Sequence, residues 1–128
     1  MTHWTFHMGL ILGIAASVTQ AQEALPKELS GRYVVVGTTV TQVFSLQGMT
    51  QDTDNTFKAK LTWWTRDQKC VIRNEPIIGR ITATGIAFDA RTKCDVPFTV
   101  ELNRAEKKWI GKAATTDGPP MVLELQAH

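Results

Sequence analysis

The only two cysteines of the chain, Cys70 and Cys94, bracket the stretch that most restricts how it can fold. Between them, Pro76 is followed by apolar and β-branched residues over positions 77–88, which Gly85 interrupts. β-Branched residues favour strands, and glycine favours turns and bends. We therefore expect a pair of strands held together at both ends, with Pro76 opening the first strand and Gly85 forming a turn or kink.

The first 21 residues resemble a secretory signal peptide. They contain no Lys, Arg, Asp or Glu, and an apolar core at 8–18 is followed by Thr19-Gln20-Ala21. An apolar run of this length that ends in small residues is typical of a cleaved signal and too short to span a membrane. We expect cleavage near Ala21 and a secreted or periplasmic product, 22–128, forming one domain. The alternative is a poorly ordered N-terminal tail.

Export also bears on the cysteines. In an exported chain, Cys70 and Cys94 most simply form one disulfide, and the alternative is two free thiols. A bridge that closes a loop of about 25 residues stabilises a fold by roughly 3 kcal/mol through the entropy of the unfolded chain.

Short β-prone segments separated by polar turns recur along the rest of the chain. The segment at 57–64 alternates most clearly, with Phe57, Ala59, Leu61 and Trp63 on one face and lysines on the other. A period of two indicates a strand with one buried face. The expected strands cover 29–37, 39–48, 57–64, 77–84 with a continuation at 86–88, 97–103, 109–115 and 121–126.

Seven or eight short strands at regular spacing indicate an antiparallel barrel or sandwich. Sequential strands usually pair, so a meander is the simplest topology, and closure would hide strand edges. We therefore expect an all-β fold, an antiparallel up-and-down barrel of seven to eight strands with one disulfide.

The residues disfavour an enzyme. Beyond residue 21 the one histidine is His128, which argues against a His-dependent triad and against a His-liganded metal site. The two serines of the same region, Ser30 and Ser45, lie outside nucleophile motifs. The net charge of +2 is too small to indicate nucleic acid or an anionic membrane as a partner. We expect no catalytic residues, no metal and no cofactor.

Two carboxylate pairs are candidates for a hydrolase site. Asp52 and Asp54 fit a polar turn, where Asp is common, and Glu101 and Glu124 fall on faces expected to be exposed, opposite one another across strands. Neither arrangement favours acid–base catalysis.

Four aromatic residues are the remaining candidates for a site. Tyr33, Trp63 and Trp109 are expected to point inward, where they either fill the core or line a small-molecule pocket. Trp64 falls on the opposite face from Trp63, so it is expected to be an interface residue or to lie under an end of the barrel.

Several short motifs resemble the avidin and streptavidin family, in particular its short-chain dimeric avidins. The resemblance extends over about 29–125 and implies an avidin-type barrel, a small-molecule ligand such as biotin or another ring compound, and a homo-dimer. The motifs are Leu29-Ser-Gly-Arg-Tyr33, Gly37-Thr38, Cys70 followed by Pro76-Ile-Ile-Gly-Arg80, Ile86-Ala-Phe88, Phe98-Thr-Val100 and Trp109-Ile-Gly-Lys112.

The family's contacts to the biotin ureido ring are incomplete in this sequence. The resemblance places three valines, 34–36, where the family has an Asn, while Thr38 replaces the neighbouring Ser. The last strand of the family, which supplies an Asp or Asn, has no expected counterpart after Gln126. Because each unmatched buried polar group costs about 1–3 kcal/mol, we expect the biotin site to be absent or much altered.

The sequence is therefore compatible with two alternative functions. One is a secreted, non-enzymatic small-molecule binder with ligand contacts from Tyr33, Thr38, Trp63 and Trp109. The other is an exported protein-interaction module similar to small periplasmic protease inhibitors, whose chains open with a comparable Leu-Ser-Gly motif; Trp64 and the basic residues near Cys70 would form its interface.

Overall fold

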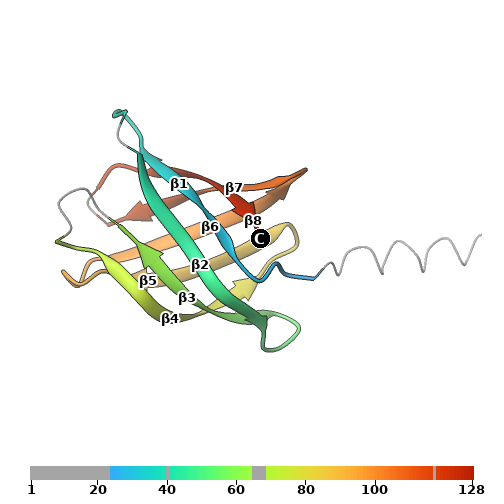
Figure 1. Cartoon of the computed structure of the whole chain (residues 1–128). Helices are drawn as coiled ribbons and strands as arrows, with labels where there is room; N and C mark the ends of the chain where they lie inside the picture. The colour runs from blue at the N-terminus through green and yellow to red at the C-terminus, as the bar shows by residue number, and fades with distance from the viewer. Residues whose placement is uncertain (1–23, 40, 65–68, 117) are drawn as a thin grey trace, which may run out of the picture.

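Eight antiparallel strands follow one another in chain order and close into a single barrel (Figure 1). The computed structural model describes residues 24–39, 41–64, 69–116 and 118–128, so the expected signal peptide lies outside the described residues. The all-β, up-and-down barrel with one disulfide is confirmed. The strands are β1 (Leu29–Val35), β2 (Thr41–Gln51), β3 (Thr56–Trp63), β4 (Ile72–Ile81), β5 (Gly85–Arg91), β6 (Pro97–Ala105), β7 (Lys108–Thr115) and β8 (Met121–Ala127).

The barrel closes where the last strand pairs with the first. The register runs from Leu29 opposite Ala127 to Val35 opposite Met121, and the His128 N–H donates to the Glu28 carbonyl at 2.9 Å. The strand expected at 121–126 is therefore confirmed as β8, and it is the strand that closes the barrel. Its closure hides the edges that β1 and β8 would otherwise expose.

Inward-facing side chains fill the middle of the barrel. In β3 the alternation predicted from the sequence is confirmed, because Phe57, Ala59, Leu61 and Trp63 are buried while the lysines between them are exposed. Every strand contributes to the same core, and each fully buried Phe, Leu or Ile stabilises the fold by about 1.5–3 kcal/mol. The barrel interior is thus a packed core.

The second strand continues past the glycine at which it was expected to end. Gly48 has a φ of +60° and lies where the register between β2 and β3 shifts. A left-handed glycine in such a shift is typical of a β-bulge, which bends a strand without ending it. β2 therefore extends to Gln51, and the N–H of Met49 beside the bulge donates to the Lys27 carbonyl at 2.9 Å.

The expected start of the fourth strand was wrong, and the continuation expected at 86–88 is part of a separate strand. β4 begins at Ile72, so Pro76 lies in its middle, opposite Lys60 of β3. Gly85 begins the separate strand β5 rather than a kink, after a turn at residues 82–84. A Cβ on Gly85 would lie 1.9 Å from the carbonyl oxygen of Leu102, so glycine is needed where β5 and β6 approach.

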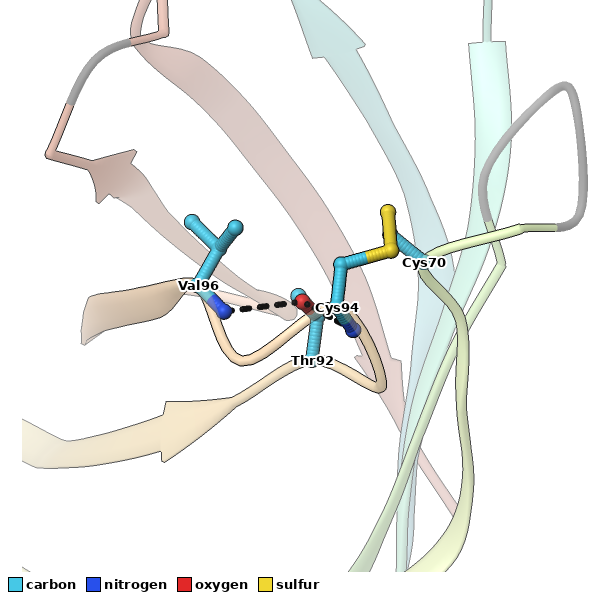
Figure 2. Close-up of a disulfide and its surroundings, with 4 residues drawn as sticks. All are labelled: Cys70, Thr92, Cys94 and Val96. Atoms are coloured by element: carbon cyan, nitrogen blue, oxygen red, sulfur yellow. Dashed lines mark hydrogen bonds between the residues drawn. A yellow bond between two sulfur atoms is a disulfide. The ribbon is translucent and has the colours of Figure 1, made fainter.

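The disulfide between Cys70 and Cys94 is confirmed and joins the loop before β4 to the turn after β5. The two Cα atoms are 5.1 Å apart. Figure 2 shows how Thr92 organises the turn: its Oγ1 accepts from the N–H groups of Cys94 and Val96, both at 3.2 Å. Thr92 is itself buried, so the position of Cys94 is fixed by the turn as well as by the bridge.

Replacing both cysteines, Cys70→Ser with Cys94→Ser, should lower the free energy of unfolding by roughly 3 kcal/mol. The bridge spans 24 positions, and without it the unfolded chain recovers the entropy of that loop. Urea unfolding followed by tryptophan fluorescence measures the change. The wild-type protein in reductant is the control and should match the double variant. An unchanged midpoint would contradict a stabilising role for the bridge.

Candidate binding site

The ladder of paired residues is interrupted between β4 and β5. Across the range 69–116, all of which is described, these strands pair at two positions, Arg80 opposite Ala87 and Ile81 opposite Ile86. The other neighbouring strands pair at five to eight described positions each. Residues 72–79 and 88–91 therefore have a partner strand on one side and an opening, which we call the seam, on the other.

Both ends of the seam are tied. At one end the chain reverses at residues 82–84, where the Thr82 N–H donates to the Gly85 carbonyl at 2.9 Å. At the other end the disulfide of Cys70 and Cys94 lies next to a hydrogen bond from the Lys93 N–H to the Val71 carbonyl, 3.4 Å long. The seam is thus an opening of limited length in the wall of the barrel.

A hollow of about 580 Å³ lies in the seam, and we call it the seam groove. Its walls come from β4 and the residue before it, and from β5 and the turn after it. Side chains of both the inner and the outer layer line it. The lining residues are Val71, Ile72, Glu75, Pro76, Ile77, Ile78, Asp89, Ala90, Arg91, Thr92 and Lys93.

Glu75 places a carboxylate on the inward side of the barrel wall. It is opposite Leu61, and Ile77 is opposite Ala59; both partners are buried in the core. Cross-strand partners point to the same face, so Glu75 and Ile77 also belong to the inward face. Glu75 is nevertheless exposed, because the seam opens beside it.

Some of the charged side chains around the groove form ion pairs and others do not. Arg91 donates to the carboxylate of Asp95 at 3.0 Å, so its charge is matched within the turn. Among the described residues, Glu75, Asp89 and Lys93 form no ion pair. The groove thus combines apolar walls with two carboxylates and one ammonium outside ion pairs. The Glu75 carboxylate lies on the inward side, where it suits a cationic group on an apolar stem.

Two of the predicted aromatic residues meet at one end of the barrel. The ring centroids of Tyr33 and Trp63 are 5.8 Å apart, and those of Trp63 and Phe98 are 4.9 Å apart. Tyr33 is 3% and Trp63 7% exposed, so the rings cover one another. The Tyr33 hydroxyl donates to the backbone carbonyl of Trp64. Both residues pack in the core, and a ligand at this end would have to approach past them.

Trp64 lies just beyond β3 and is half-buried. Its N–H donates to the Val43 carbonyl at 3.3 Å, which continues the pairing with β2. The guanidinium carbon of Arg73 lies 4.6 Å from the ring centroid, a cation–π contact between β4 and the end of β3. Of the basic residues expected beside it, Arg66 lies outside the described residues.

The other two predicted ligand contacts, Trp109 and Thr38, do not lie beside Tyr33 and Trp63. Trp109 is buried near the start of β7, whereas Tyr33 and Trp63 lie near the ends of β1 and β3. Because odd-numbered strands run in one direction, Trp109 is at the opposite end of the barrel, with the Arg104 guanidinium 4.9 Å from its ring centroid. Thr38 is exposed in the turn after β1, and its hydroxyl donates to the Val35 carbonyl at 2.9 Å.

The candidate carboxylate pairs do not form catalytic pairs. Glu101 is on β6 and Glu124 on β8, with β7 between them, so the two carboxylates are not cross-strand partners. Asp52 lies 3.7 Å from the Lys58 ammonium in an exposed ion pair. In the described ranges, no three His, Cys, Asp or Glu side chains are grouped to hold a metal ion. The described part of the chain also contains no helix with the length and apolar character to cross a bilayer.

Known proteins provide a fold comparison. No protein-family model and no curated protein matches the sequence. The chain is similar to a redesigned β-barrel at 16% identity and a TM-score of 0.61, over 84% of this chain and 95% of that one. It is also similar to a de novo designed fluorescence-activating β-barrel at 13% identity and a TM-score of 0.55, over 84% and 97%. At such identities the likeness shows the barrel fold.

The sequence contained an unused signal for the seam. Glu75, Ile77 and Ala90 were not predicted as site residues, because Pro76 was expected to open the strand. Over residues 72–78 the pattern lacks the period of two seen in β3, and a proline interrupts it. Proline is confined to edges and bulges of sheets, so Pro76 inside a strand indicates an unpaired side.

The ionisation of Tyr33 provides a test of the packed end. Tyr33 is the chain's one tyrosine, and burial raises its pKa from 10.0 to about 12. Tyrosinate absorbance of the folded protein should therefore reach half of its full value near pH 12. The unfolded phenol ionises first, so the free energy of unfolding should fall as the pH rises from 10 toward 12. A midpoint near 10, with circular dichroism showing folded protein, would contradict this burial.

Proposed function

We propose that this chain is an exported, non-enzymatic binding barrel whose ligand lies in the seam groove. The observation that carries the proposal is the interrupted β4–β5 ladder, which leaves a hollow of about 580 Å³ beside an otherwise packed core. Ligand pockets in proteins commonly measure about 300–1,000 Å³ and combine apolar walls with a few polar groups.

The chemistry of the groove selects the ligand's functional group. Ile72, Ile77 and Ala90 supply apolar wall, and Glu75 supplies a carboxylate on the inward side. A ligand with an apolar body and a cationic group would match both. Because Glu75 is exposed, the ion pair contributes at most about 1 kcal/mol, and burial of the apolar body supplies the rest.

Export is part of the proposal. The disulfide of Cys70 and Cys94 is stable in oxidising compartments, and the apolar segment at 8–18 has the composition of a signal peptide. The absence of histidine between residue 21 and His128 supports a binding role over acid–base catalysis.

An avidin-like function is a second candidate, and the contact of the Tyr33 and Trp63 rings at one barrel end favours it. A ring compound would stack on these residues after local rearrangement. Tight binding of biotin is not expected, because the valines at 34–36 offer no amide in the first strand. A homo-dimer remains part of this second candidate.

The proposed function can be tested with phenethylamine and its neutral counterpart, phenethyl alcohol. We expect the amine to bind about two- to five-fold more tightly, because an exposed ion pair is worth about 0.2–1 kcal/mol. Chemical-shift changes in NMR spectra measure the affinity and should cluster at the amides of Ile77 and Ala90, in the walls of the groove.

Two variants complete this experiment. Glu75→Gln should abolish the preference for the amine, whereas Glu101→Gln, an exposed glutamate on β6 outside the groove lining, should preserve it. Shifts confined to Tyr33 and Trp63 would favour the second candidate instead. An amine preference that survives Glu75→Gln, or no shift at the groove, would overturn the proposed site.

A further inference from the structure

We propose that the seam groove binds an extended peptide segment, which adds as a strand to the open side of β5. This inference rests on the proposed function, because it names the class of ligand that would carry a cation to Glu75. The peptide would use its backbone for pairing and its side chains for selectivity.

The open side of β5 offers main-chain hydrogen-bonding groups in a row. Residues 88–91 pair with β6, from Phe88 opposite Val100 to Arg91 opposite Pro97, and have no partner on the β4 side in the described structure. Backbone groups of a strand point alternately to its two sides, so half of those in this stretch point into the seam. A small molecule satisfies one or two such groups, while a peptide strand satisfies the row.

The opposite edge is less suited to pairing. Pro76 lacks an N–H in the middle of β4, and Asn74 has a φ of +53°, outside the range of extended strands. The register of β4 with β3 also shifts between Leu61 and Trp63. β4 therefore serves as a wall of side chains, and β5 is the edge that accepts a strand.

Side-chain chemistry defines which segment fits. In a strand added to β5, alternate side chains share the inward face of Ala90, which is opposite the buried Phe98. Glu75 and Ile77 approach this face from β4. A segment with apolar residues at alternate positions and one Lys or Arg among them would bury apolar surface and meet the Glu75 carboxylate.

The length of the seam limits the paired part of the segment. The open edge runs from Phe88 to Arg91, because the N–H groups of Thr92 and Lys93 already bond to Val96 and Val71. At about 3.3 Å per residue this edge is roughly 13 Å of strand. Because the turn at 82–84 and the disulfide close the seam at its ends, the rest of a longer peptide would leave the groove toward solvent.

The test uses an acetylated octapeptide amide, Thr-Val-Thr-Val-Thr-Lys-Thr-Val, in which the lysine takes one of the positions shared by the valines. Two further peptides carry N-methyl groups at the even or at the odd positions. A strand on one edge donates every second N–H, so one methylated peptide should bind at least about ten-fold more weakly and the other within about two-fold of the parent. NMR titration of the full-length folded protein measures all three affinities.

Each outcome separates the two proposals. Unequal loss between the methylated peptides, with weaker parent binding to Glu75→Gln than to Glu101→Gln, supports strand addition. Equal affinities, equal losses or no binding of the octapeptide overturn it. If phenethylamine still occupies the groove in those cases, the proposed function stands and the inference about the peptide fails.

Discussion

Pairing of backbone N–H and C=O groups across neighbouring strands determines where this barrel is closed and where it is open. Seven of the eight neighbouring strand pairs keep an extended register, and between β4 and β5 it shrinks to two positions within the described chain. Buried backbone groups need partners, so the unpaired stretches must face water. That requirement exposes Glu75 on the inward side of β4 and creates the groove in which we place the ligand.

The same interruption explains why the covalent bridge is where it is. The packed core reaches all eight strands, so most of the barrel is held by burial of apolar side chains. At the seam, backbone hydrogen bonds between β4 and β5 contribute little to stability. The disulfide and the turn organised by Thr92 join these two strands instead. A binding site at this place combines exposed backbone with fixed ends, which limits the entropy lost when a ligand is bound.

Much of the fold could be predicted from the sequence, and much of the candidate site could not. Alternation identified the inward faces of β3, β6 and β8, and cysteine count with export predicted the bridge. A pattern of period two reports which face a residue is on but not which end of the barrel it occupies, so Trp109 was grouped with Tyr33 and Trp63. The seam was missed because Glu75 is a polar residue at an inward position, which a pattern search interprets as the end of a strand.

Native-state hydrogen exchange of the free protein, read amide by amide by NMR, tests the open seam most directly. The account predicts alternation along residues 75–79 and 88–91: amides that point to β3 or β6 exchange slowly, and the amides between them exchange as fast as those of exposed turns. Uniformly slow exchange along both stretches would show a continuous ladder between β4 and β5 and would contradict the account.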